Sequence, residues 1–298
     1  NFSAMTVYAG LLIFFFVVLL SDVKITTEAF SNIFNLNNFL DVNNLAPLLT
    51  VAGTIFAYFS ILIISFGDFS RYVKNEKELK KGNLSLILNL IIFSFLSVFI
   101  VTGSDVFLNQ KFSDIDRIFT NPTDIIGKFD NIQITIVVLF FIIIASASTN
   151  LVANFIPSQY SLINFAPSIL SLKSASYLIA FFGLLIAIFW LTILSQIGIL
   201  SFVDTFGAFF GPLFGVMAAD YYLIKNQELS NKDLYSIDKE SAYYYSGGWH
   251  IKGVYSLILG FIFSASTIWN TNLMFLQSYA WIIGAFVAWI TYYLLAKK

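Results

Sequence analysis

Long uncharged apolar runs, separated by short clusters of charged and turn-forming residues, dominate the chain. A run of roughly 20 apolar residues can cross the hydrocarbon core of a bilayer as an α-helix. Two of the runs are too long for one helix, and we predict breaks in them at Pro157 and Pro167 and at Asn270-Thr271-Asn272. The pattern therefore predicts eight spans, at residues 5–21, 47–67, 84–104, 132–155, 175–195, 200–224, 253–270 and 275–296.

The composition agrees with a chain embedded in a membrane. Hydrophobic residues make up 58% of the chain and charged residues 11%, whereas a soluble domain carries about a quarter charged residues. The net charge of -1 argues against nucleic acid as a partner, because phosphate binding needs a basic face. The absence of Cys excludes a disulfide framework and thiolate metal sites. We therefore predict an all-α integral membrane protein whose surroundings are the lipid bilayer.

The junction after the second span predicts the orientation. It opens the most basic loop of the chain, with Arg71, Lys74, Lys77, Lys80 and Lys81. Because Lys and Arg concentrate in cytoplasmic loops, this loop is predicted to lie inside the cell. Alternation of the loops then places residues 225–252 and the C-terminus inside, and the more acidic loops 22–46 and 105–131 outside. The sequence thus predicts a multi-pass protein of the cell (inner or plasma) membrane with a cytoplasmic C-terminus.

The fourth span carries polar side chains that are unfavourable against lipid tails, so it should face protein or a water-filled path. Ala145, Ser148 and Thr149 share one narrow face, and their hydroxyls and any loosened carbonyls are hard oxygen ligands suited to an alkali cation. Asn150 and Asn154 form a neighbouring face, where each carboxamide offers a donor and an acceptor to a neutral heterocycle. The alternative is close helix packing through small residues, with hydrogen bonds across the interface.

The sixth span has a pattern of glycines that suits a helix in a gate or a tight interface. Three glycines recur at four-residue spacing: Gly207, Gly211 and Gly215. Small residues let a neighbouring helix approach closely, and Pro212 removes one internal hydrogen bond, so this helix is expected to be flat and bendable. A static packing helix explains the pattern equally well. Asp204 and Asp220 bracket the span and are predicted to be interfacial rather than buried.

The second span offers aromatic side chains and a charged pair at its end. Phe56, Tyr58 and Phe59 form a candidate stacking platform for a planar ligand, although aromatic side chains in a core or against lipid are the commoner explanation. Asp68 and Arg71 stand at i and i+3, so they can pair on one helix face as a structural latch at the cytoplasmic end.

Three separate motifs occur in order along the chain. They are Gly67-Asp68-Phe69-Ser70-Arg71-Tyr72, Ser148-Thr149-Asn150-Leu151-Val152-Ala153-Asn154, and Phe206-Gly207 with Gly211-Pro212-Leu213-Phe214-Gly215-Val216-Met217-Ala218-Ala219-Asp220-Tyr221-Tyr222. Together they resemble the nucleobase-cation symporter family 1, the permeases for cytosine and purines, uracil, thiamine, allantoin and hydantoin. The resemblance covers essentially the whole chain.

The resemblance implies a helix bundle of the five-plus-five inverted-repeat transporter type, of which this chain is the C-terminal eight-span part and lacks the first four spans. A span also begins within a few residues of Asn1 with no charged region or cleavage site ahead of it, so we expect a fragment. The implied domains are a transporter core at 1–224, a cytoplasmic loop at 225–252 and two peripheral spans at 253–298. Within the core, 5–21 would be the last helix of repeat one and 47–224 repeat two.

The resemblance also implies roles for single residues. By position, a Na⁺ site would fall on the carbonyl of Ala145 and the hydroxyls of Ser148 and Thr149, with H⁺ as the other candidate coupling ion. Asn154 would be the substrate-binding carboxamide. Phe59 stands where the family has a substrate-stacking Trp.

We therefore expect a secondary active transporter that imports a nucleobase-like heterocycle of the purine, pyrimidine, hydantoin or allantoin class by cation symport with alternating access. The expected partners are this heterocycle, the bilayer and the missing N-terminal spans, and we expect no cofactor beyond the coupling ion and no enzymatic activity. A symporter for an amino acid or other organic solute of the same architecture remains an alternative. A membrane-embedded enzyme would need clustered ionisable side chains that the mid-membrane stretches do not show, and a structural membrane subunit is the last alternative.

Overall fold

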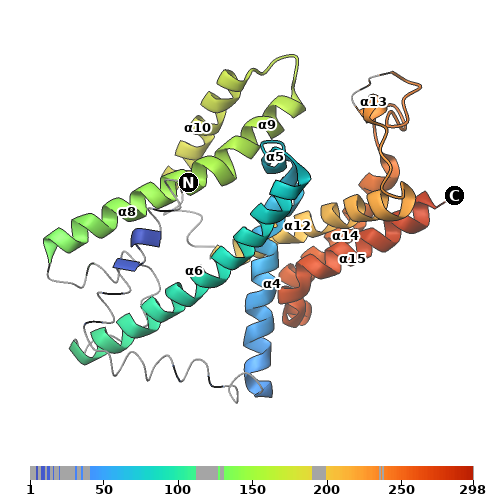
Figure 1. Ribbon diagram of the computed structural model, residues 1–298. Helices are drawn as coiled ribbons and strands as arrows, with labels where there is room; N and C mark the ends of the chain where they lie inside the picture. Colours follow the sequence, from blue (N-terminus) through green and yellow to red (C-terminus); the bar gives the residue numbers. More distant parts are fainter. Residues whose placement is uncertain are drawn as a thin grey trace. The chain divides into compact units, whose positions relative to one another are not determined.

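The computed structural model describes residues 41–111, 127, 131–189, 199–234, 236 and 238–297, together with positions 5, 8–10, 12, 13, 16, 20, 31 and 35 (Figure 1). The regular elements in this part of the chain are all helices. Seven candidate spans occur in it: Leu45–Ile64, Glu76–Val101, Ile132–Phe165, Leu172–Phe189, Val203–Ile224, Ile251–Trp269 and Thr271–Ala296. The all-α membrane fold is thus confirmed, with seven of the eight predicted spans. The first predicted span, 5–21, lies largely outside the described residues and stays a prediction.

Two compact units make up the chain. The first comprises Asn1–Asp41 and Asp68–Ile179, and the second comprises Val42–Gly67 and Ala180–Lys298. The helices of the first unit are α6 (Glu76–Lys111), α8 (Ile132–Asn150), the π-helix η1 (Leu151–Phe155) and α9 (Ile156–Phe165). Those of the second are α4 (Val42–Ile64), α12 (Ile199–Ala219), the π-helix η3 (Asp220–Ile224), α13 (Asn231–Leu234), α14 (Ile251–Trp269), the 3-10 helix η4 (Thr271–Tyr279) and α15 (Ala280–Ala296). The boundaries fall within α5 (Phe66–Ser70) and α10 (Leu172–Phe189). The predicted domain limits at 224 and 252 stay predictions.

The basic junction of the first unit is more helical than the sequence suggested. α6 begins at Glu76, so the last three of the five basic residues lie in its first turns rather than in a loop. The side chain of Asn75 accepts a hydrogen bond from the N–H of Glu78 at 3.0 Å, as a helix N-cap does. Lys80 pairs with Glu76 at 2.7 Å, one turn away. The prediction that all five basic residues lie in a loop is therefore wrong, because capping and pairing extend the helix to Glu76.

The fourth span is longer than the sequence predicted. The segment Ile132–Phe165 is helical throughout, so the break predicted at Pro157 is wrong, and the helix ends before Pro167. Proline fits because the five residues before Ile156 form a π turn, in which the N–H of Ile156 donates to the carbonyl of Leu151. This wider turn shifts the hydrogen bonds around the position where proline has no N–H to donate.

In the second unit, α12 packs against α15, α14 and α4 (Figure 1), and its glycine face meets α15 and α4. Gly207, Gly211 and Gly215 are buried. A Cβ at these three positions would overlap Ala57 of α4, the carbonyl oxygen of Trp281 and the carbonyl oxygen of Ala285, respectively. The four-residue spacing therefore produces the close helix contact that the sequence predicted.

The proline of α12 is also explained by packing. Pro212 is fully buried and has no N–H for the carbonyl of Ala208, four residues before it. The hydroxyl of Ser264 on α14 donates to that carbonyl at 2.6 Å, and both residues are 0% exposed. A neighbouring helix thus satisfies the backbone group that proline leaves unpaired, as is common where proline occurs within a membrane helix.

Candidate functional site

The predicted cation ligands lie together near the C-terminal end of α8. The hydroxyl of Ser148 donates to the carbonyl oxygen of Ala145 at 3.0 Å, so these two oxygens already lie side by side. Thr149 follows on the same face and is exposed, whereas Ala145 and Ser148 are half-buried. Hard cations bind oxygen ligands at about 2.3–2.6 Å, so one ion can touch two oxygens at this separation. The structure thus brings two of the three predicted oxygens together, those of Ala145 and Ser148.

The π turn η1 follows directly after these residues. The N–H of Ile156 donates to Leu151, and Pro157 has no N–H. The carbonyl of Val152 would accept a hydrogen bond from the N–H of residue 156 in an α-helix and from that of residue 157 in a π-helix. Ile156 donates to Leu151 instead and Pro157 has no N–H, so neither residue donates to Val152. Such turns occur often at functional sites. The sequence predicted loosened carbonyls but not the π turn, for which Pro157 was the signal.

The two predicted carboxamides form a pair. Nδ2 of Asn154 donates to Oδ1 of Asn150 at 2.6 Å, and Nδ2 of Asn150 donates to the carbonyl of Ser146 at 3.0 Å. Both side chains are exposed. The pair fixes the orientation of Asn154 and leaves its Oδ1 and one N–H without a partner among the described residues. A ligand with one donor beside one acceptor would match these two groups.

The predicted aromatic residues lie in the second unit, and the four polar candidates of α8 and η1 lie in the first. Phe56 stacks on Trp281 of α15, with ring centroids 5.8 Å apart and an interplanar angle of 25°. Phe59 makes an edge contact with Tyr58 at 5.2 Å. Tyr58, rather than Phe56 or Phe59, lines an apolar cavity of about 260 Å³, which Phe206 also lines. The structure thus gives Phe56 a packing contact and Tyr58 a place at a cavity.

The predicted pair of Asp68 and Arg71 is present and has an aromatic partner that the sequence did not indicate. Arg71 pairs with Asp68 at 3.2 Å, and its guanidinium lies 4.3 Å from the ring centroid of Tyr160 on α9. The hydroxyls of Tyr72 and Tyr160 are hydrogen-bonded, and this bond raises the pKa of Tyr72 above its ordinary value. The junction is therefore tied to the helix that follows the π turn, within one unit.

A buried carboxylate was missed. Asp204 is 6% exposed and accepts a hydrogen bond from Nε2 of Gln277 on η4 at 2.8 Å. The expectation that this residue is interfacial rather than buried is therefore wrong. The two partners are 73 residues apart, so no local signal could have identified the contact. Asp220 is half-buried at the other end of the span.

Comparison with known proteins yields one family and several relatives. The profile of the family described as permease for cytosine/purines, uracil, thiamine, allantoin matches residues 1–293. An allantoin permease of Bacillus subtilis is 28% identical over 82% of this chain and 48% of its own length. A purine-uracil permease of Arabidopsis thaliana is 25% identical over 81% of this chain and 41% of its own length. A putative allantoin permease of Escherichia coli is 25% identical over 84% of this chain and 50% of its own length. The chain thus spans about half the length of these curated relatives, and no solved structure matches it significantly.

Proposed function

Because this chain belongs to the family of permeases for cytosine/purines, uracil, thiamine and allantoin, we propose that it moves a nucleobase-like heterocycle across the membrane together with a cation. The relatives include an allantoin permease and a purine-uracil permease. Both kinds of substrate contain a heterocyclic ring that carries N–H and C=O groups next to each other. Stacking and carboxamide hydrogen bonds suit such molecules, whereas a zwitterion would need charged partners.

The polar segment at the end of α8 and in η1 is the observation that carries this proposal. One helix there presents oxygen ligands on one face and a fixed pair of carboxamides on the next, beside a π turn. Cation and substrate would then bind a few ångströms apart on one helix. Each would favour the arrangement of the helix that the other needs, and this coupling is what symport requires.

Asn154 is assigned to the heterocycle, with Asn150 holding it in position. Ala145, Ser148 and Thr149 are assigned to the cation, which is Na⁺ in our proposal and is replaced by a proton if uptake proves to follow a proton gradient. Three oxygens are too few to replace the hydration shell of a cation, so the remaining ligands would come from other spans of the complete protein. Phe56 and Phe59 stay sequence-based predictions for stacking of the ring.

The transport cycle and the orientation of the protein are part of the same proposal. The repeats would rock around the bound solute in alternating access. The pair of Asp68 and Arg71 would hold the cytoplasmic end closed, and α12 would bend at Pro212. We place the protein in the cell membrane with a cytoplasmic C-terminus, because the loops with clustered Lys and Arg are expected on that side.

Uptake of radiolabelled purines, pyrimidines, hydantoin and allantoin by the complete protein in proteoliposomes tests the proposal. Uptake should saturate for one heterocycle and should require a Na⁺ gradient. Asn154→Ala should raise the KM for the heterocycle, and Thr149→Ala should raise the Na⁺ concentration needed for half-maximal uptake. Thr135→Ala is the matched control, because its hydroxyl bonds to the carbonyl of Asn131 in the first turn of the same helix. Uptake driven only by a proton gradient would remove the Na⁺ site, and the absence of uptake of every heterocycle would remove the substrate class.

A further inference from the structure

Three membrane spans of the second unit end at one cavity. Its volume is about 230 Å³, and its apolar lining is Ile224, Ile251 and Ala296. Ile224 is the last residue of one candidate span, Ile251 the first of another and Ala296 the last of a third. The cavity therefore lies where hydrocarbon gives way to the headgroup layer.

The loop before α14 builds one wall of this cavity. Gly247 and Gly248 both have positive φ, of 63° and 86°, and form a tight turn closed by the pairing of Ser246 with Trp249. Tyr245 also has a positive φ, of 47°, which is uncommon for a residue with a side chain. Its ring stacks on His250, with centroids 3.9 Å apart and an interplanar angle of 11°. The backbone turn and the stacked rings thus hold this wall in place.

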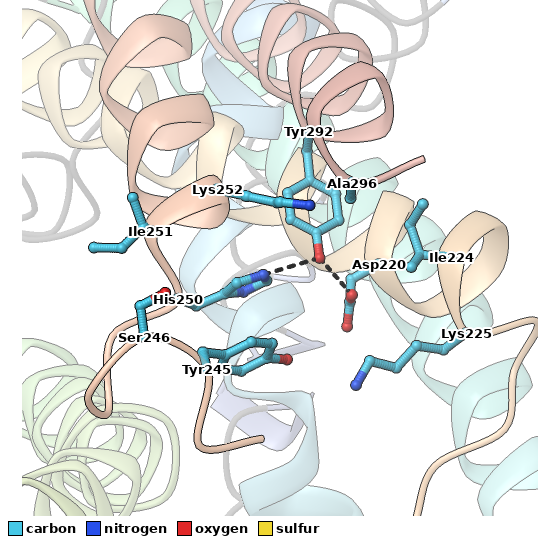
Figure 2. A pocket seen from close by; sticks show the side chains of 10 residues that line it. All are labelled: Asp220, Ile224, Lys225, Tyr245, Ser246, His250, Ile251, Lys252, Tyr292 and Ala296. Atoms are coloured by element: carbon cyan, nitrogen blue, oxygen red, sulfur yellow. Dashed lines mark hydrogen bonds between the residues drawn. The ribbon is translucent and has the colours of Figure 1, made fainter. Parts of the chain in front are cut away.

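A hydrogen-bonded chain closes the floor of the cavity (Figure 2). The hydroxyl of Tyr292 donates to Oδ1 of Asp220 at 2.6 Å, and its oxygen lies 3.2 Å from Nε2 of His250. Because a tyrosine has only one hydroxyl proton, Nε2 must carry the proton in the second bond. The carboxylate of Asp220 is therefore already engaged, and Tyr292 is 1% exposed.

Two ammonium groups at the cavity lack a carboxylate partner. Lys225 and Lys252 both line it, and neither forms an ion pair with any residue that the structure describes. The ammonium of Lys225 lies over the ring of Tyr243, 3.7 Å from its centroid. The lining thus has two positive charges against one negative charge. It is cationic on its polar side and aliphatic on its membrane side.

We propose that this cavity binds the phosphate headgroup of an anionic membrane phospholipid. Lys225 and Lys252 would pair with the phosphate, and the glycerol end and the first acyl carbons would lie along the two isoleucines. Basic pockets between spans are known to bind anionic headgroups, and this cavity is smaller than the roughly 300–1,000 Å³ typical of drug-sized ligands. The proposal is independent of transport, since it rests only on residues at the end of three spans.

Lipid binding by native mass spectrometry and by titration in detergent tests the site directly. Lys225→Gln combined with Lys252→Gln should weaken the binding of phosphatidylglycerol about 30-fold. The matched control is Lys232→Gln with Lys239→Gln, which also removes two positive charges, from exposed positions between η3 and α14, and should leave binding unchanged. Replacement of Lys225 and Lys252 by Arg should retain binding, and thermal unfolding should show that each variant is folded. The proposal is overturned if the variant with Lys225→Gln and Lys252→Gln binds phosphatidylglycerol as tightly as the wild type, or if the control variant loses as much binding.

His250 gives a second readout, because it is the only histidine of the chain. Burial lowers its pKa, Lys225 and Lys252 act in the same direction, and Asp220 opposes them. Tyr245 and Tyr292 are the other titratable groups that face the ring. Phosphatidylglycerol should raise the pKa of His250, followed by NMR of labelled histidine, whereas phosphatidylcholine should not. If inorganic phosphate at matched concentration gives the same rise and the lipid does not compete with it, the cavity is a site for a soluble anion and the lipid proposal is refuted.

Discussion

Replacement of Ser264 by Ala isolates the hydrogen bond that compensates for the proline of α12. The hydroxyl of Ser264 donates to the carbonyl of Ala208 at 2.6 Å, and both residues are 0% exposed. Pro212 cannot provide the missing N–H. The variant therefore leaves a buried carbonyl without a donor and changes the packing volume by only one oxygen atom.

The expected loss follows from two scales. An unpaired buried carbonyl costs about 1–3 kcal/mol, whereas hydrogen bonds between membrane helices average about 0.6 and reach about 1.7 kcal/mol. Because this carbonyl is fully buried and has no alternative helical donor, we expect a loss of about 1.5 kcal/mol. At about 2–4 °C per kcal/mol for a protein of this size class, Tm should fall by about 3–6 °C.

The assay is thermal unfolding in detergent, with one control and one rescue. Ser256→Ala removes a hydroxyl that is equally buried on the same helix, but this hydroxyl bonds only to the carbonyl of Lys252 within its own turn, at 2.8 Å. It should lower Tm far less. With Ala at position 212 the backbone N–H is restored, so Ser264→Ala should then cost about 1 kcal/mol less. Equal effects of the two serine variants, or additivity with the proline variant, would refute the reasoning.

Three further expectations follow from contacts in the structure, each measured by thermal unfolding. Gly211→Ala places a methyl group on a backbone carbonyl of α15 and should lower the free energy of unfolding by about 1–3 kcal/mol. At Gly183 an added Cβ would meet nothing within 4 Å, so Gly183→Ala should stabilise the protein by about 0.5–1 kcal/mol. The reverse order of the two effects would contradict the packing. Burial lowers the pKa of His250 below 6.5, so the unfolded state takes up its proton first, and stability is full above pH 6.5 and falls as the pH drops toward the lowered pKa. His250→Gln should abolish that slope, and an unchanged slope would assign it to other groups. Asp204→Leu leaves Nε2 of Gln277 without its acceptor and should lower stability by about 1–3 kcal/mol, more than Asp204→Asn, which keeps an acceptor; equal losses would show that the bond is unimportant.

The spans and the shared helix faces could be predicted from the sequence, because each depends on neighbours along the chain. A bilayer needs about 20 apolar residues per crossing, and positions three and four apart lie on one face of a helix. The spacing of Ala145 and Ser148 was therefore enough to place them side by side, and the structure confirms that they touch. The roles of these residues in binding a cation stay a proposal.

The errors arose where one local rule competed with another. Pro157 was predicted to end a helix, but a π turn takes up the irregularity and the helix continues to Phe165. Lys77, Lys80 and Lys81 were assigned to a loop by charge alone, but they lie in α6, where Asn75 caps the helix and Lys80 and Lys81 pair with glutamates one turn away. In both cases the residue type was read correctly and its effect on the backbone was not.

The sequence by itself determined where this chain crosses the membrane and which side chains share a helix face, because lipid thickness and helical periodicity act locally. Only the tertiary structure decided which polar groups have partners. Ser264 meets Ala208 across 56 residues, Gln277 meets Asp204 across 73 and Tyr292 meets Asp220 across 72. A buried polar group must find a hydrogen bond wherever one lies in space, and helix packing, which periodicity does not encode, determines where that is.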